Sequence, residues 1–357
     1  MDNAAAAQER AESIRMIRDS VAAIATRGDL KRIRALRFTE AGFDPVAWKA
    51  MGDLGWIGLR LAEDHGGAGL GMAECCALAE ELGRCLVPEP LVEGMLSATL
   101  LAAAGEEALL ARLLAGDAVV LTAWQEAADT LVSPGGAAVR RVFIPMARAA
   151  THFLVPRAEP GGLSLWLVEG PVAETRPMQD GGHVGFLDPG GAAGRRLSGD
   201  VGAALSRALD EAALTTAAYL LGVMEQAFAM TLDYLRTRSQ FGRPIGSFQA
   251  LQHRAVDLRI QAALTRASVE DAAATLDGLD DRQIAPRQAA VSRAKARAAE
   301  ACMLVTRAAV QLHGAIGYTD EYDAGLFLRK AMVLANRYGS AALHRRRFIA
   351  TAPDIAT

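Results

Sequence analysis

Cysteine, net charge and long apolar runs are all scarce in this 357-residue sequence. The four cysteines lack metal-ligand spacing, so we expect no metal site, and adjacent Cys75 and Cys76 would point in different directions on a helix. A formal net charge of -3 gives no reason to expect a nucleic-acid or membrane partner. The longest uncharged apolar stretch, Ala212 to Met224, is too short to span a bilayer. With no signal-peptide hydrophobic region either, the sequence predicts a cytoplasmic protein with reduced, buried thiols.

The sequence does contain helical periodicity at both ends and strand-like runs between them. Helices are predicted over 10–25, 45–54, 72–86 and 90–104, and again in long apolar stripes after about residue 205. Strands are predicted over 119–122, 139–144, 153–155 and 163–168, with turns at the Gly-Gly pairs that begin at 135, 161, 181 and 190. We therefore predict a mainly α protein with a small β-domain. Its parts are an N-terminal all-α domain (1–117), a shortened middle β-barrel or sandwich (118–204) and a C-terminal four-helix bundle (205–357).

The most informative segment lies between two predicted helices and reads Arg238-Ser-Gln-Phe-Gly-Arg-Pro-Ile-Gly-Ser-Phe-Gln249. Arginine forms charge-assisted bonds to phosphate, glutamine donates and accepts, and phenylalanine offers an apolar face. These side chains on a loop stiffened by proline and glycine suit a planar aromatic cofactor that carries a pyrophosphate. The alternative is a helix–turn–helix corner with incidental polar residues. Nearby, Ser247 is expected to cap the following helix, Pro286 to start the next one, and Gly314 to end it.

Four segments in this order resemble the acyl-CoA dehydrogenase family of flavoproteins, across roughly residues 40 to 350. They are Leu54-Gly-Trp-Ile-Gly-Leu with Glu63-Asp-His-Gly-Gly-Ala-Gly-Leu-Gly71, the loop at 238–249, Gln311-Leu-His-Gly-Ala-Ile-Gly-Tyr318, and Leu328-Arg-Lys-Ala331. The resemblance implies the same order of domains, FAD in a cleft between the β-domain and the bundles, and assembly as dimers or tetramers. The matches to FAD contacts are Arg238 for the pyrophosphate, Gln240, Phe241 and Gln249 beside it, and Gln311 and Gly314 for the adenosine half, approached from another subunit.

The chain departs from this family where the catalytic base belongs. Family dehydrogenases remove the α-proton of an acyl-CoA thioester with a glutamate while a hydride passes to the flavin. Tyr338 stands at the usual position of that glutamate, and Ala212 at the alternative position on the first bundle helix. Tyrosine is a far weaker base at neutral pH. Adjacent Glu211 is a candidate base, although it should point about 100° away, and a solvated or helix-N-terminal carboxylate is the alternative.

The β-domain departs too, since 121–126 and 142–147 do not reproduce the segments that the family places against the flavin ring. Thr122 is expected to keep one hydrogen bond to the ring. The catalytic residue is thus unknown from the sequence.

These observations lead to a functional hypothesis with two alternatives. The chain is predicted to be an FAD-dependent acyl-CoA dehydrogenase that works as one subunit of a heteromeric complex. Its expected partners are an acyl-CoA substrate, such as a fatty or steroid side-chain thioester, a homologous dehydrogenase subunit and an electron-transfer flavoprotein. The alternatives are a flavin-free scaffold subunit and a self-sufficient dehydrogenase or oxidase with an unrecognised base.

Overall fold

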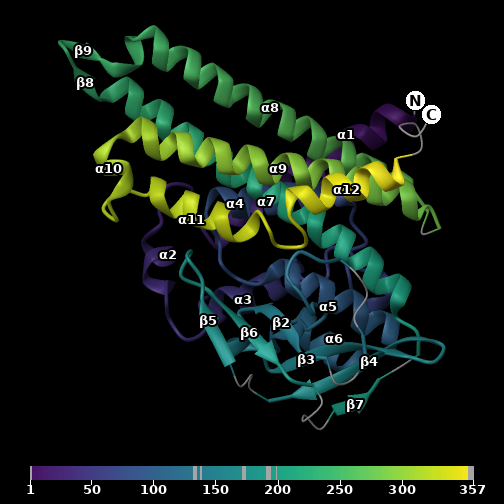
Figure 1. Ribbon diagram of the computed structural model, residues 1–357. Helices are drawn as coiled ribbons and strands as arrows, with labels where there is room; N and C mark the ends of the chain where they lie inside the picture. The colour runs from purple at the N-terminus through teal and green to yellow at the C-terminus, as the bar shows by residue number, and fades with distance from the viewer. Residues whose placement is uncertain are drawn as a thin grey trace. The chain divides into compact units, whose positions relative to one another are not determined.

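The computed structural model describes residues 2–131, 135–136, 139–170, 174–189, 194–197, 199–280 and 282–352 (Figure 1). The helices before the strands are α1 (Asp2–Ser20), α2 (Lys31–Leu36), α3 (Pro45–Asp53), α4 (Met72–Arg84), α5 (Leu91–Ala104) and α6 (Glu107–Leu114). Those after them are α7 (Gly202–Thr237), α8 (Gln249–Gly278), α9 (Ile284–His313), α10 (Ala315–Tyr318), α11 (Ala324–Leu334) and α12 (Ala341–Thr351). The predicted fold class, mainly α with a β-domain in the middle, is confirmed.

The middle of the chain forms two small sheets. The strands are β1 (Val120–Thr122), β2 (Arg141–Pro145), β3 (His152–Glu159), β4 (Gly162–Glu169), β5 (Glu174–Pro177), β6 (His183–Leu187) and β7 (Gly194–Arg196). One sheet has the order β1-β3-β4-β7, with β1 parallel to β3, and the other has the order β2-β6-β5. The four predicted strands are present, and β3 and β4 turn at Gly161 and Gly162, both with positive φ. The predicted turn at 190–191 lies outside the described residues.

The chain divides into two compact units that do not follow its order. One unit comprises Met1–Leu30, Cys76–Val87 and Leu214–Thr357, and the other comprises Lys31–Cys75 and Pro88–Ala213. Helices α4 and α7 therefore contribute residues to both. The first unit is called the helical unit below, and the second, which holds both sheets, the β-unit. The domain boundaries at 117 and 204 stay a prediction.

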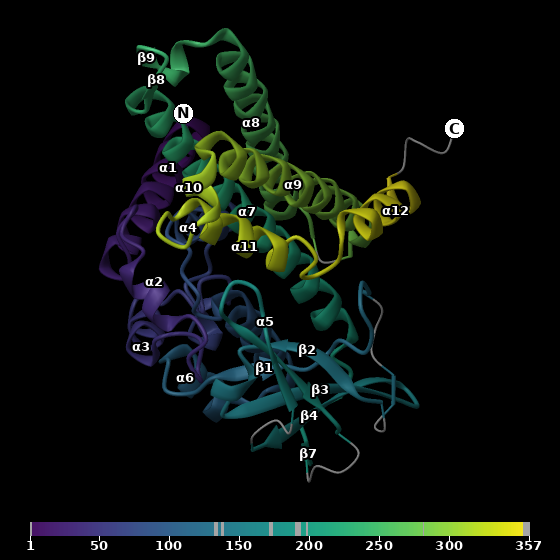
Figure 2. The ribbon, with the colours of Figure 1, turned by 60° about the vertical axis from the view of Figure 1, so that its left-hand side comes forward.

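Long helices pack closely in the helical unit because small residues line their contacts. Figures 1 and 2 both show α8 running along α9, and alanines such as Ala262, Ala294 and Ala298 are fully buried on these helices. Helices α4 and α7 approach each other closely at two glycines. A Cβ added at Gly222 would lie 1.9 Å from the Glu80 carbonyl oxygen, and one added at Gly83 would lie 2.1 Å from the Tyr219 oxygen.

The variant Gly222→Ala is therefore expected to destabilise the protein, because the new methyl group meets backbone that cannot move aside. We expect a loss of at least about 1–3 kcal/mol in the free energy of unfolding, measured by urea denaturation. Gly278→Ala is the matched control, since nothing lies within 4 Å of its would-be Cβ. That substitution should be neutral or slightly stabilising. Equal stability of the two variants would contradict the close helix crossing.

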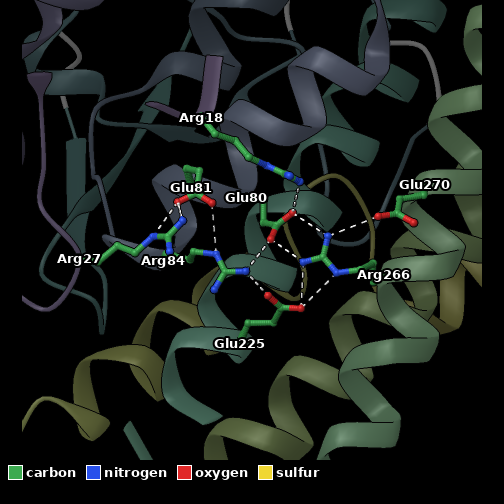
Figure 3. Close-up of polar contacts among 8 residues, drawn as sticks. All are labelled: Arg18, Arg27, Glu80, Glu81, Arg84, Glu225, Arg266 and Glu270. Atoms are coloured by element: carbon green, nitrogen blue, oxygen red, sulfur yellow. Dashed lines mark hydrogen bonds and ion pairs between the residues drawn. The ribbon is translucent and has the colours of Figure 1, made fainter. Parts of the chain in front are cut away.

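Charged side chains form a network with a buried centre and an exposed rim at the same helix crossing (Figure 3). We call it the ionic cluster; its members are Arg18, Arg27, Glu80, Glu81, Arg84, Glu225, Arg266 and Glu270. At its centre, the Arg266 guanidinium donates to Glu80 at 2.5 Å and to Glu225 at 2.9 Å. Only 5% of the Glu80 side chain and 10% of the Glu225 side chain are exposed. The cluster ties α1, α4, α7 and α8 together.

The residues that the structure describes contain neither a candidate membrane-spanning helix nor a candidate metal-binding cluster. None of their helices is long and apolar enough to cross a membrane. No group of three or more His, Cys, Asp or Glu side chains among them could hold a metal ion. None of the four cysteines forms a disulfide and all four are buried, in line with the reduced, buried thiols that the sequence predicted.

Candidate functional site

The segment at 238–249 folds as a tight β-hairpin followed by a turn of 3-10 helix. Strands β8 (Ser239–Gln240) and β9 (Arg243–Pro244) are antiparallel, with Gln240 paired to Arg243. The two residues between them, Phe241 and Gly242, have φ angles of 53° and 79°. Two successive positive φ angles are typical of a type I′ hairpin turn, in which a bulky residue such as phenylalanine is strained. Backbone strain of this kind is concentrated at functional sites. Here the strained turn places the aromatic ring of Phe241 at the tip of the loop.

Phe248 packs against side chains of this hairpin. The Arg243 guanidinium carbon lies 4.2 Å from the centre of the Phe248 ring, and the Phe241 ring meets the same ring edge-on at 6.2 Å. The predicted helix cap at Ser247 is wrong, because Ser247 Oγ donates to the Pro244 carbonyl at 2.8 Å instead. A turn of 3-10 helix occupies 245–247, so that α8 starts only after Phe248.

The polar side chains of the hairpin point into solvent. Arg238 is held through its backbone, since its amide donates to the Tyr234 carbonyl at 2.9 Å and its carbonyl accepts from Ile245 at 2.8 Å. Its guanidinium has no hydrogen bond or ion pair within the described residues. Gln240 and Gln249 are also exposed, and 89% of Phe241 is exposed. A fixed backbone with an uncommitted cation and exposed amides is a donor set that fits a phosphate-bearing dinucleotide.

A cluster of three aromatic rings, tilted against one another, brings the second part of the motif to the same place. The His313 ring lies 4.5 Å from that of Tyr234 and 4.6 Å from that of Tyr322. Since Tyr234 precedes Arg238 by about one helical turn and His313 lies between Gln311 and Gly314, this aromatic cluster joins the end of α7 to the end of α9. Figure 1 shows β8, β9 and α10 at this one end of the long helices. The structure thus brings Arg238, Gln311 and Gly314 to one end of the helical unit.

His313 itself was missed by the sequence reasoning, although it lies inside a quoted motif. It is 3% exposed, and its Nδ1 lies 2.7 Å from the Ala309 carbonyl oxygen. Burial holds the pKa of this imidazole below its ordinary range, while the bond to Ala309 opposes the shift. A neutral ring suits a packing role between two tyrosines. Gly314 ends α9 as predicted, with φ 66° and its amide bonded to the Gln311 carbonyl at 3.1 Å.

Replacing His313 by leucine should therefore loosen the end of α7. The Arg238–Ser239 bond is a trypsin site in the adjoining exposed hairpin, so we expect its cleavage to become several-fold faster in His313→Leu, because a loosened segment opens more often. His313→Phe keeps an aromatic ring and should retain most of the protection. Equal cleavage rates in all three proteins would contradict the anchoring role of the aromatic cluster.

Tyr338, at the usual base position, lies in a loop that is fixed from several sides. The loop joins α11 to α12, and Tyr338 is 5% exposed with φ 55°. Its carbonyl accepts a hydrogen bond from His344 Nε2 at 2.8 Å. Buried Lys295 on α9 donates to the carbonyls of Ala335 at 2.9 Å and Gly339 at 3.1 Å. The loop is built around backbone carbonyls and offers no carboxylate where the family's glutamate would stand.

Glu211 and Ala212 belong to the β-unit part of α7. The Glu211 carboxylate accepts from Arg60 at 2.8 Å and from Arg207 at 3.0 Å, with 14% of its side chain exposed. The expectation of a solvated or helix-N-terminal carboxylate is wrong, because α7 already begins at Gly202 and buries this turn. Burial alone raises the pKa of Glu211, but the charges and hydrogen bonds of Arg60 and Arg207 outweigh it and hold the pKa below its ordinary range. A lowered pKa weakens a carboxylate as a general base.

Thr122 sits on β1 and is buried. Its hydroxyl oxygen lies 2.9 Å from that of Ser97 on α5, a fully buried residue that the sequence reasoning did not single out. A hydroxyl donates once and accepts twice, so this bond leaves capacity for a further partner. The expected ring-side hydrogen bond of Thr122 stays a prediction.

Nearly the whole chain is similar in sequence to known proteins of one family. Sequence models of the acyl-CoA dehydrogenase N-terminal and C-terminal domains match residues 11–118 and 202–352. The chain is 32% identical to the acyl-CoA dehydrogenase IpdE2 of Mycolicibacterium smegmatis over 335 residues, which is 93% of this chain and 94% of the relative. It is also 32% identical to the acyl-CoA dehydrogenase FadE27 of Mycobacterium tuberculosis, over 88% of this chain and 90% of the relative.

Solved structures of acyl-CoA dehydrogenase chains share the fold of this chain. A chain of the Tcur3481-Tcur3483 steroid ACAD G363A variant superimposes with a TM-score of 0.81 at 28% identity, covering 97% of this chain and 98% of that one. A chain of the ChsE4-ChsE5 complex from Mycobacterium tuberculosis superimposes with a TM-score of 0.79 at 27% identity, covering 96% and 97%.

Proposed function

Since the chain belongs to the acyl-CoA dehydrogenase family, we propose that it is an FAD-binding subunit of a heteromeric enzyme that desaturates an acyl-CoA thioester. One contrast carries this proposal. One end of the helical unit holds both the uncommitted Arg238 and the Gln311 turn, whereas Tyr338 and Ala212 stand at the two base positions. A chain that lost the cofactor altogether would have no need for the exposed cation and the strained hairpin.

The residues that would hold FAD are those of the hairpin and the α9 turn. Arg238 would bind the pyrophosphate with two parallel hydrogen bonds, which a guanidinium makes better than an ammonium group. Phe241 would pack against the dinucleotide, with the amides of Gln240 and Gln249 beside it. Gln311 and the Gly314 backbone would meet the adenosine half. When bound, FAD supplies the hydride acceptor of the family reaction.

The partner and the substrate follow from the missing carboxylate and from the relatives. A second dehydrogenase-like chain with an intact glutamate would supply the base, and an electron-transfer flavoprotein would reoxidise the complex. Two similar structures carry names that describe a steroid ACAD and a two-component complex. By analogy we propose a bulky acyl-CoA, such as a steroid side-chain derivative, as the substrate class.

The test of the cofactor assignment is the variant Arg238→Ala, produced together with any partner chain. It should lose roughly 2–5 kcal/mol of FAD binding, because a phosphate would be left without its cation once FAD and a neighbouring subunit cover the exposed hairpin. Flavin content and oligomer size should fall together, and Arg238→Lys should rescue only part of the loss. Arg236→Ala is the control, since Arg236 also lies near the end of α7, where its side chain is 70% exposed and pairs with Asp233.

Two results would overturn this proposal. Full flavin occupancy in Arg238→Ala would show that this arginine is only a surface residue. A wild-type chain that never acquires FAD, with or without a partner, would favour the flavin-free scaffold, which the departures at 121–126 and 142–147 also fit.

A further inference from the structure

The loop between α11 and α12, residues 335–340, carries Tyr338 and is called the base loop below. Both flanking helices pack against α9 (Figures 1 and 2). Ala335 and Asn336 of the loop, together with Ala341 at the start of α12, line a cavity of ≈ 830 Å³. Side-chain packing therefore leaves part of the loop uncovered, and its backbone needs polar contacts to stay in one conformation.

A fully buried lysine on α9 binds the backbone of the base loop. Lys295 Nζ donates to the carbonyl oxygen of Ala335 at 2.9 Å and to that of Gly339 at 3.1 Å. The carbonyl oxygen of Leu334, at the end of α11, accepts from the same group at 3.4 Å. A buried ammonium is costly unless it is well hydrogen-bonded, so three carbonyls around Nζ indicate a place built for this side chain. One cation thus ties both ends of the loop together.

A buried histidine on α12 holds the middle of the base loop. His344 Nε2 donates to the Tyr338 carbonyl at 2.8 Å, and its Nδ1 lies 3.2 Å from Ser292 Oγ on α9. Tyr338 and Gly339 have φ angles of 55° and 98°, in the left-handed region that a tyrosine rarely adopts. A Cβ added at Gly339 would lie 2.8 Å from His344 Nε2. The loop is therefore strained at the position of interest, and such strain is concentrated at functional sites.

We propose that Lys295 is a positioning residue that keeps the base loop in the shape a catalytic carboxylate needs, although this chain has a tyrosine there. The bonds from Lys295 and His344 reach main-chain carbonyls, so they do not depend on the side chain at 338. The chain then retains a latent base position, at which a carboxylate would take the α-proton of an acyl-CoA thioester. Lys295 belongs to none of the segments that carry the family resemblance. The inference rests on the proposed function, because it needs a chain that binds FAD and the thioester.

The first measurement needs neither cofactor nor substrate. Trypsin cleaves after Arg337, and mass spectrometry of the fragments gives the rate at the Arg337–Tyr338 bond. Lys295→Met should raise this rate several-fold, because a loop whose carbonyls lack their donor opens more often. Lys295→Gln, whose amide still donates, should keep part of the protection and replaces the methionine variant if that one does not fold.

Arg297→Met is the matched control for both measurements. Arg297 lies on the same helix as Lys295, and its guanidinium donates to Gln261 on α8 at 2.7 Å rather than to the base loop. Its loss should change the cleavage rate at Arg337 less than about twofold, as expected for a separate contact.

The second measurement asks whether the latent position can work, using Tyr338→Glu in the assembly as purified. The probe is 3-thiaoctanoyl-CoA, whose β-position is sulfur and has no hydride to lose. In D₂O the carboxylate would take an α-proton and return a deuteron, so the recovered thioester gains mass without net oxidation. Tyr338→Glu should exchange on the order of 10²-fold faster than the wild type, the usual contribution of a positioned base.

A positioning role also predicts how the exchange rate responds when Lys295 is changed. Lys295→Gln in the Tyr338→Glu background should lower the limiting rate per folded chain by about tenfold or more, because a misplaced base loses its geometry. The half-saturating thioester concentration should stay the same. Loss of stability alone does not produce this split, and Arg297→Met in the same background should leave both values unchanged.

The outcomes separate the inference from the proposal beneath it. Unchanged cleavage at Arg337 in both Lys295 variants, or no gain of exchange in Tyr338→Glu, overturns the inference while the proposed function stands. Faster cleavage with an unchanged exchange rate makes Lys295 a structural residue only and overturns its positioning role. A wild type that acquires no FAD in any assembly overturns the proposed function, and the inference with it, whatever trypsin shows.

Discussion

Purified without a partner chain, the protein is expected to bleach its flavin with an acyl-CoA thioester about 10²–10⁴-fold more slowly than a relative with an intact base. The reason is chemical, since removal of the α-proton needs a carboxylate or an equivalent group close to the substrate. Tyr338 is a weak base in a buried loop, and Ala212 has no titratable group. Anaerobic stopped-flow absorbance of the bound flavin measures this rate directly.

The variant Glu211→Gln tests whether Glu211 acts as the catalytic base in the unpartnered chain. If the wild type is slow, this variant should bleach at the same residual rate, because Glu211 is engaged by Arg60 and Arg207. Rapid bleaching by the unpartnered wild type would contradict the heteromeric proposal. Its loss in Glu211→Gln would then identify Glu211 as the base of a self-sufficient dehydrogenase.

The fold was predictable where a local sequence pattern, such as apolar periodicity, specifies the element. Period-three and period-four apolar stripes anticipated the long helices, and Gly314 ends α9 as its sequence position suggested. Strands β5, β6 and β7 were not predicted. Glu174–Pro177 and Gly194–Arg196 are mostly polar and have no apolar alternation, whereas His183–Leu187 is a run of five residues that is buried throughout and shows no alternation either. The β8–β9 hairpin was hidden for a different reason: its turn is Phe241-Gly242 rather than the Asn-Gly or Asp-Gly pairs that mark such turns.

The candidate site was predictable only in its exposed half. Arg238, Gln240 and Phe241 lie in one short segment, so their chemistry could be recognised together. The groups that hold site residues in place come from far along the chain: His313 packs on Tyr234, and Ser97 meets Thr122. Such pairs depend on tertiary packing, and nothing in the local pattern around either partner specifies them.

The variant Arg266→Met is expected to cost the protein about 3–5 kcal/mol of stability, because it leaves two buried carboxylates of the ionic cluster without their shared cation. Glu80 and Glu225 would keep Arg84 as a partner, yet the cluster would carry excess negative charge in a poorly solvated place. Arg293→Met is the matched control, since the Arg293–Asp271 pair is about half exposed on both sides and should contribute no more than about 1 kcal/mol. Urea denaturation at neutral pH measures both variants.

The same cluster should make stability depend on pH in a defined direction. Burial raises the pKa of Glu80, but hydrogen bonds and charges from Arg266 and Arg84 outweigh it, and the pKa falls below its ordinary value of 4.5. A carboxyl with a lowered folded-state pKa stabilises the protein above its unfolded pKa, and this contribution is lost as the pH falls through the folded value. The melting temperature of the wild type should therefore drop below about pH 4.5, with a shallower drop in Glu80→Gln. Equal acid sensitivity in Glu80→Gln and the wild type would show that other carboxylates control acid unfolding, and that the ionic cluster does not.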